Sequence, residues 1–151
     1  MTNEDTLSLN ADQAFYELMG STGRAELKVF STAELIESGQ VPAGAVYGLA
    51  GCLKTDCKDT LKLLMMSRST FYRRKRSGVL NSAEAYRVYR YVRLYTFAHT
   101  LFHGDADSAR EWLNKPTYVF GSKTPLQHAE TERGAHEVET LIGRIQHGIP
   151  S

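Results

Sequence analysis

The chain has 151 residues, of which 42% are hydrophobic and 23% charged, a composition typical of one or two small globular domains and not of a disordered protein. No apolar run is long enough to span a bilayer, and the acidic first residues lack the pattern of an export signal. We therefore expect a cytoplasmic protein that does not associate with membranes, in which Cys52 and Cys57 are free thiols.

The net charge of +1 hides an uneven distribution of charged side chains. Residues 1–53 carry 2 basic and 7 acidic side chains, residues 54–93 carry 11 basic and 3 acidic, and residues 94–151 carry 5 basic and 7 acidic. A basic block of +8 between acidic flanks is typical of a nucleic-acid site. A solvated basic face is the other interpretation, and charge alone does not decide between the two.

Helical patterns follow one another along the chain after residues 1–25, which we interpret as a loosely attached N-terminal arm. Ser31 and Glu34 have the spacing of a capping box. Further helices are expected at about 42–53, 59–65 and 70–76, then a long one at about 82–102 and shorter ones up to Gly148. No convincing strand pattern occurs. The predicted fold class is all-α, with a helix-turn-helix N-terminal lobe, a long linking helix and a small helical C-terminal lobe.

The long helix changes character along its length. Arg87, Arg90 and Arg93 have i+3 spacing, which predicts one exposed basic side in its first half. Residues 91–102 are apolar almost all round, and such a helix must be surrounded by other elements. We expect this second half to lie between two lobes of the chain or in a dimer interface.

Residues 59–76 have the layout of a helix-turn-helix, with a basic second helix after a break at residues 67–69. Ser69 is expected to cap the second helix and Phe71 to be its buried anchor. Such a helix fits the major groove of DNA. The side chains expected to contact bases or phosphates are Arg68, Ser69, Thr70, Tyr72, Arg73, Arg74, Lys75, Arg76 and Arg90.

Three positions depart from the usual helix-turn-helix pattern. Met65 stands where a Gly of positive φ commonly ends the first helix, Leu61 where a small residue is usual, and Arg74 where an apolar residue is usual. These departures affect how the motif would be oriented on DNA. They do not affect the assignment of residues 59–76 as a helix-turn-helix.

Candidate enzymatic and metal sites are poor. His99 and His103 have the i, i+4 spacing of metal ligands, but no Glu follows His99 as in zinc proteases, and the two cysteines are spaced too widely for a zinc CxxC. Packed or capping histidines explain the pair better. Phosphate-loop, dinucleotide and nucleophile-elbow motifs are missing. We expect no metal site, no cofactor, no catalytic residue and no enzymatic activity.

The last thirty residues contain one amphipathic helix. Val138, Leu141, Ile142 and Ile145 form an apolar stripe expected to anchor the helix on its own lobe. Two glycines, Gly134 and Gly143, lie within the same helix, where each costs about 1 kcal/mol relative to Ala. Each glycine therefore indicates a close approach of another helix or of a partner.

Three stretches together resemble a known family: WLNKP at 112–116, FGSKTPL at 120–126 and TERGAHEVETLIGRIQHG at 131–148. They are similar to the toxin-binding domain of Xre/MbcA/ParS antitoxins, and residues 31–103 resemble the Xre-type helix-turn-helix that accompanies it. The resemblance implies the antitoxin of a RES-Xre type II system, which neutralises a NAD-consuming RES-domain toxin and represses its own operon on promoter DNA. Self-association, at least as a dimer, is implied as well.

The resemblance also implies a division into a DNA-binding region, 26–103, and a toxin-binding region, 104–151. Within the second region, the residues expected to contact the toxin are Glu139, Gly143, Arg144, His147 and Ile149. The alternative function is a plain helix-turn-helix transcriptional regulator whose C-terminal lobe dimerises the protein or senses a ligand. Co-purification with a toxin distinguishes the two.

Overall fold

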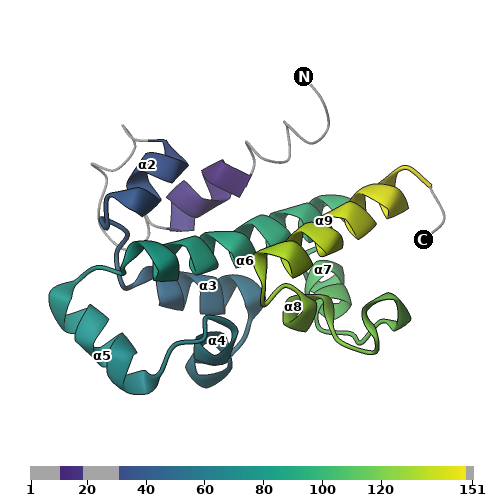
Figure 1. Cartoon of the computed structure of the whole chain (residues 1–151). Helices are drawn as coiled ribbons and strands as arrows, with labels where there is room; N and C mark the ends of the chain where they lie inside the picture. Colours follow the sequence, from purple (N-terminus) through teal and green to yellow (C-terminus); the bar gives the residue numbers. More distant parts are fainter. Residues whose placement is uncertain (1–10, 19–30, 149–151) are drawn as a thin grey trace.

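A computed structural model describes residues 11–18 and 31–148 of the chain (Figure 1). Residues 11–18 are helical, and the elements that follow them are α2 (Thr32–Glu37), α3 (Ala45–Leu53), α4 (Cys57–Leu63), α5 (Arg68–Ser77), α6 (Ser82–Leu101), α7 (Ala106–Leu113), the 3₁₀ turn η2 (Tyr118–Phe120), α8 (Pro125–His128) and α9 (Glu132–Gln146). Strand-like pairing within these residues is limited to two isolated bridges, Pro42 with Val79 and Thr117 with Lys123. The expected all-α fold is confirmed.

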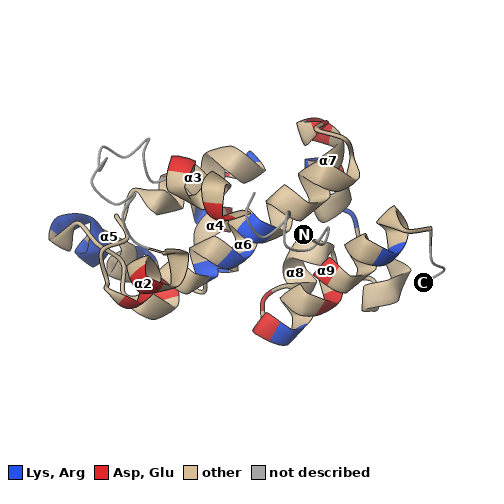
Figure 2. Cartoon of the chain, turned by 90° about the horizontal axis from the view of Figure 1, so that it is seen from above, with Lys and Arg blue, Asp and Glu red and all other residues tan. Residues whose placement is uncertain are grey.

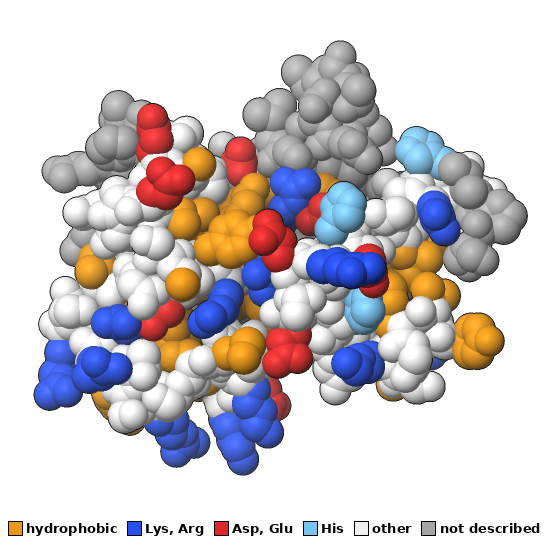
Figure 3. Space-filling model, viewed as in Figure 1, with side chains coloured by type: hydrophobic (Ala, Val, Ile, Leu, Met, Phe, Trp, Pro, Cys, Tyr) orange, Lys and Arg blue, Asp and Glu red, His pale blue; other side chains and the backbone are white. Residues whose placement is uncertain are grey.

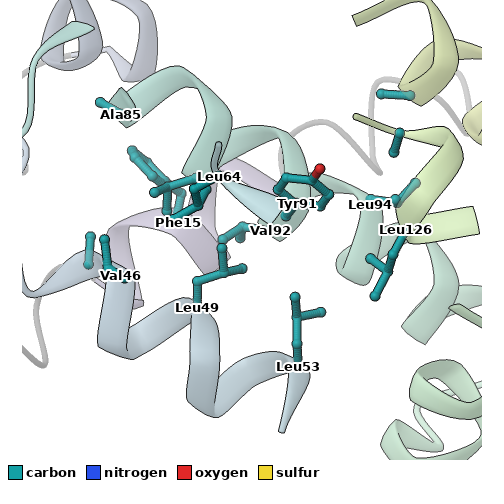
Figure 4. Close-up of a cluster of buried hydrophobic side chains, with 14 of the residues drawn as sticks. Phe15, Val46, Leu49, Leu53, Leu64, Ala85, Tyr91, Val92, Leu94 and Leu126 are labelled. Carbon is teal, nitrogen blue, oxygen red and sulfur yellow. The ribbon is translucent and has the colours of Figure 1, made fainter. Parts of the chain in front are cut away.

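The 20-residue helix α6 is the centre of the fold. It packs against α2 and α3 and against α7 and α9, and α9 runs alongside it (Figure 1). Tyr91 and Leu94 of α6 are fully buried, and Figure 4 shows Tyr91 and Val92 among side chains of α3 and Leu94 beside Leu126 of α8. The apolar second half of the helix is therefore surrounded by elements of its own chain.

Residues 11–18 are part of this core. Ala11 and Phe15 are both fully buried, and the ring of Phe15 meets the ring of Tyr89 edge-on, with centroids 5.3 Å apart. The Tyr89 hydroxyl donates a 2.7 Å hydrogen bond to Oδ1 of Asp12. The loosely attached arm expected for residues 1–25 therefore does not describe residues 11–18, because Ala11 and Phe15 share one apolar helical face. Residues 1–10 and 19–25 lie outside the described part.

The ends of the helices follow the capping rules, with shifts of one or two residues. The capping box of Ser31 and Glu34 is present as expected. Helix α6 has a second box, formed by Asn81 and Glu84, so Asn81 and not Ser82 is its N-cap. None of the described helices is both long and apolar enough to cross a membrane.

The two glycines of α9 have different surroundings. A Cβ atom at Gly134 would collide with the carbonyl oxygen of His128, at the end of α8. No atom lies within 4 Å of a Cβ placed at Gly143. The expectation of a close backbone approach is thus confirmed inside the chain for Gly134, whereas Gly143 faces open space.

These surroundings predict opposite effects of the same substitution. Gly134→Ala should lower the free energy of unfolding by about 3 kcal/mol, since backbone must move to make room. Gly143→Ala should raise it by up to about 1 kcal/mol, since Ala favours the helix and meets nothing. Urea unfolding followed by circular dichroism measures both. Equal effects of the two substitutions would contradict this account of the helix.

Candidate functional site

The helix-turn-helix consists of α4, a tight turn and α5. Met65 has φ of +53°, so it adopts the left-handed conformation in which Gly is usual, at a cost of about 1–2 kcal/mol. The amide of Met66 donates to the carbonyl oxygen of Leu61 at 2.9 Å, which closes the end of α4. Leu61 and Phe71 are both buried. The turn is therefore formed despite two of the three unusual residues, and Phe71 is the buried anchor expected.

Ser67, and not Ser69, caps α5. Its hydroxyl accepts the backbone N–H of Thr70 at 3.1 Å and lies 3.2 Å from the Ser69 hydroxyl. The helix therefore begins at Arg68, and Ser69 is exposed within its first turn. Free N–H groups at such a helix start favour a phosphate oxygen.

The outer face of α5 carries most of the residues expected to contact DNA. Tyr72 is 60% exposed, and Thr70 is half-buried with its hydroxyl bonded to Arg73 Nη2 at 3.2 Å. Figure 2 shows Lys and Arg positions along α5, and Figure 3 shows basic side chains gathered at this end of the molecule. The exposed side chains of the helix are Arg68, Ser69, Tyr72, Arg73, Lys75, Arg76 and Ser77.

Lys75 is held against aromatic rings. Its ammonium lies 5.5 Å from the ring centroid of Tyr47 on α3 and 5.2 Å from that of Tyr72. A hydrogen bond to the Tyr47 hydroxyl is the largest cause that raises the pKa of Lys75, so this side chain stays charged. The Tyr47 ring also packs edge-on to Phe71, at 5.4 Å. Lys75 thus connects α5 to α3 as well as adding charge to the surface.

Arg74 forms an ion pair within the fold. Its Nε donates to Oε1 of Glu84 at 2.7 Å, and the Glu84 side chain is only 8% exposed. Glu84 also accepts the Asn81 backbone N–H at 2.9 Å. This ion pair disfavours the expected contact of Arg74 with DNA, because the position that is usually apolar is filled here by one half of the pair.

The arginine row of α6 does not form the expected exposed side. Arg87 donates to the carbonyl oxygen of Leu64, and Arg90 Nη1 donates to the carbonyl oxygen of Glu130 at 2.8 Å. Arg93 pairs with Glu139, Nε to Oε1, at 2.7 Å. Arg90 is therefore half-buried near the start of the last helix, which disfavours the expected contact with DNA.

The ion pair of Arg93 with Glu139 also bears on the residues expected to contact the toxin. The side chain of Glu139 is only 16% exposed in its pair with Arg93, so it joins α9 to α6. Arg144 and His147 are exposed, as expected, and the backbone at Gly143 is open. Ile149 lies outside the described residues. Ile145, expected in the buried stripe, is 45% exposed, whereas Val138, Leu141 and Ile142 are buried.

Tyr118 and Val119 form a protruding turn of exposed apolar side chains, here called the knuckle, which the sequence patterns did not predict. Tyr118 is 96% and Val119 50% exposed, while Phe120 is buried and stacks on His128 with ring centroids 4.2 Å apart. The amide of Thr117 donates to the carbonyl oxygen of Lys123 at 3.0 Å and closes the loop. The available signal was the apolar run Tyr-Val-Phe inside a segment between Pro116 and Gly121.

A cleft of about 260 Å³ separates the knuckle from α9. Glu137 at its edge lies 2.7 Å from His128 Nε2 and 3.2 Å from Arg133 Nε, and these two partners, His128 first, lower its pKa. The cleft is lined by Val119, Phe120, Glu137, Thr140, Leu141 and Arg144.

The histidines and cysteines take part in no metal cluster. Over residues 11–18 and 31–148, no three side chains of metal-binding type lie together. The ring of His99 packs on Tyr95 at 5.7 Å. Burial raises the pKa of Cys52 to about 11, which keeps its thiol protonated, and Cys57 is exposed and free.

Two family models match two separate segments of the chain. Residues 33–93, which contain α4 and α5, match the Antitoxin Xre-like helix-turn-helix domain. Residues 98–148, which contain the knuckle and α9, match the Antitoxin Xre/MbcA/ParS C-terminal toxin-binding domain. The chain belongs to the Xre family of antitoxins.

Three curated relatives of the chain carry the name Antitoxin Xre. The chain is 38% identical over 94 residues to Antitoxin Xre of Photorhabdus laumondii, covering 62% of this chain and 64% of that protein. It is 41% identical over 83 residues to Antitoxin Xre of Yersinia enterocolitica, covering 55% and 56%, and 33% identical over 74 residues to Antitoxin Xre of Pseudomonas putida, covering 49% and 46%. The match spans less than two thirds of the length of each of these relatives.

Two neighbouring arginines of α5 should behave differently in a stability measurement. Arg74→Ala leaves the carboxylate of Glu84 nearly buried without its partner and should lower the free energy of unfolding by about 2–3 kcal/mol. Arg73→Ala, on the exposed face, should change it by less than about 0.5 kcal/mol. Chemical denaturation of both variants checks this. If Arg73→Ala were the more damaging substitution, the assignment of inner and outer faces would be wrong.

Proposed function

We propose that the chain is a non-enzymatic antitoxin that binds the promoter DNA of its own operon and neutralises a RES-domain toxin. The observation that carries this proposal is the placement of two different exposed surfaces on one fold. A cationic helix face lies in the segment that matches the helix-turn-helix domain, and an apolar knuckle lies in the segment that matches the toxin-binding domain. We keep the division into a DNA-binding region at 26–103 and a toxin-binding region at 104–151.

DNA is bound by the exposed face of α5. The N-terminal residues of a recognition helix reach base edges, and arginines there discriminate guanine by two parallel hydrogen bonds. Arg68 and Arg73 are exposed and not paired with a carboxylate in the described part of the chain, which supports them in this role. Arg76 is likewise exposed and unpaired there, and it lies toward the end of α5, nearer the phosphates. Tyr72 adds an exposed ring, and Lys75 adds charge near the phosphates.

Binding to promoter DNA should depend on Arg73 and not on Arg90. Arg73→Ala should cost about 1–3 kcal/mol of binding free energy to the operator if the side chain reads a base. Arg90→Ala should leave affinity and salt dependence close to those of the parent, because its guanidinium is engaged with the carbonyl oxygen of Glu130. Fluorescence anisotropy over a range of salt concentrations measures both. Unchanged binding after joint replacement of Arg68, Arg73 and Arg76 would exclude α5 as the DNA-reading element.

The toxin is bound by the exposed side of α9 together with the end of the chain. RES-domain toxins act on NAD, as the family resemblance implies, so an antitoxin needs only to cover the cofactor cleft. Gly143, Arg144 and His147 lie on the accessible side of α9, and the open backbone at Gly143 allows a close approach. Ile149 is retained as a contact by proposal, and Glu139 is withdrawn because it is paired with Arg93.

A bulky side chain at Gly143 should block the toxin and spare the fold. Gly143→Trp should abolish protection of cells that express the toxin, while promoter binding in a gel shift is retained. Gly51→Trp is the matched control, because Gly51 is also an exposed helical glycine with nothing within 4 Å, but it lies on α3. Full protection by Gly143→Trp would show that the toxin binds elsewhere.

Purification tests the proposal against a plain transcriptional regulator. Co-expressed with the adjoining gene of its operon, the chain should co-purify with a RES-domain protein. Sedimentation of the complex measures self-association, which we propose on the family resemblance alone, since α3, α7 and α9 already bury the apolar half of α6. Recovery of the chain alone would favour the plain regulator.

A further inference from the structure

Exposed large apolar side chains of the toxin-binding region occur in one place. Within the described residues of 98–148, they are Tyr118, Val119 and Ile145. Val119 lines the cleft between η2 and α9, and Ile145 follows Arg144 of the same cleft, one helical turn from Leu141. Figure 3 shows hydrophobic side chains exposed at this right-hand end of the molecule, beside basic ones. We call the set formed by Tyr118, Val119, Leu141, Arg144 and Ile145 the knuckle surface.

The knuckle is held in its conformation before any partner arrives. Phe120 is anchored in the core against His128, and the bridge between Thr117 and Lys123 closes the loop. Gly121 and Ser122 both have positive φ, at 62° and 69°, which turns the chain back sharply. A loop fixed in this way loses little conformational entropy on binding, which favours affinity. Exposing two large apolar side chains on a rigid turn is typical of an interaction site.

The chemistry of the cleft defines what fits it. Its floor is apolar, with Phe120 and Leu141. At its edge, Glu137 is already paired with His128 and Arg133. The exposed guanidinium of Arg144 forms no hydrogen bond or ion pair with any described residue. The complementary group is therefore an apolar side chain with a carboxylate next to it.

We propose that the knuckle surface is a docking site for the toxin, where an apolar side chain of the toxin enters the cleft and a toxin carboxylate pairs with Arg144. This inference rests on the proposed function. The toxin is the favoured occupant because the whole surface lies in the segment that matches the toxin-binding domain. It also lies at the opposite end of the molecule from α5, so DNA bound to α5 does not cover it (Figure 1). The surface extends the contact proposed for Gly143 from α9 onto the preceding loop.

The experiment measures the affinity of the full-length chain for the RES-domain protein of the adjoining gene by isothermal titration calorimetry. Val119→Glu should weaken binding at least about tenfold, since a charge would enter an apolar cleft. Arg144→Glu should weaken it comparably, and Arg144→Lys should weaken it less. Met65→Glu is the matched control, because Met65 is a 61% exposed apolar residue of the helix-turn-helix turn, and it should leave the toxin affinity unchanged.

The outcomes separate this inference from the function on which it rests. If the parent chain does not bind the RES-domain protein, the proposed function fails. If the parent binds and folded Val119→Glu and Arg144→Glu bind within about twofold of it, the knuckle surface is not the docking site and the proposed function stands. Should Val119→Glu fail to fold, Tyr118→Glu decides, because that side chain is 96% exposed. Variants that alter only the sedimentation of the chain alone would assign the surface to a second copy and overturn the inference.

Discussion

Burial of α6 is the constraint on which both surfaces depend. The helix contributes Tyr91, Leu94 and Phe97 to a single continuous core, and full burial of one such side chain contributes about 1.5–3 kcal/mol. It packs against α2 and α3 of the N-terminal segment and against α7 and α9 of the C-terminal segment. Neither lobe closes its core without this helix, so the two family segments form one packed unit in the described chain.

Polar contacts along α6 fix the position of each lobe. The Tyr91 hydroxyl donates to the carbonyl oxygen of Leu63 at 3.1 Å, and Arg87 holds the carbonyl oxygen of Leu64, so both contacts bear on the turn before α5. Arg90 contacts the carbonyl oxygen of Glu130 just before α9, and Arg93 pairs with Glu139 in the middle of α9. The basic block is therefore divided by function: Arg74 and the α6 row orient the elements, and the outer face of α5 supplies the charge that DNA would meet.

The sequence was sufficient for features that local patterns encode. Helix periodicity and caps predicted the all-α fold, the helix-turn-helix and the buried anchor Phe71. It was insufficient wherever the decisive contact joins distant residues. The pair of Arg93 and Glu139 links positions 46 residues apart, and the spacing of either residue on its own helix reads as solvent-exposed. The knuckle was missed for a related reason, since exposure of Tyr118 depends on where Phe120 and the Thr117–Lys123 bridge hold the loop.

The relative orientation of α6 and α9 determines how the two surfaces can be used. Tyr86 contacts Glu132, and Arg93, farther along α6, contacts Glu139, farther along α9. Because the contacts proceed in the same chain direction on both helices, α6 and α9 run parallel. The C-terminal end of α9 therefore lies beside the end of α6 that is farthest from α5 (Figure 1). A helix of 20 residues is about 30 Å long, close to the diameter of a small domain. With α5 and the knuckle surface near opposite ends of such a rod, a toxin docked as proposed and a DNA duplex at α5 would not compete for space. The arginine row of α6, which contacts both lobes, would then be the connection between them.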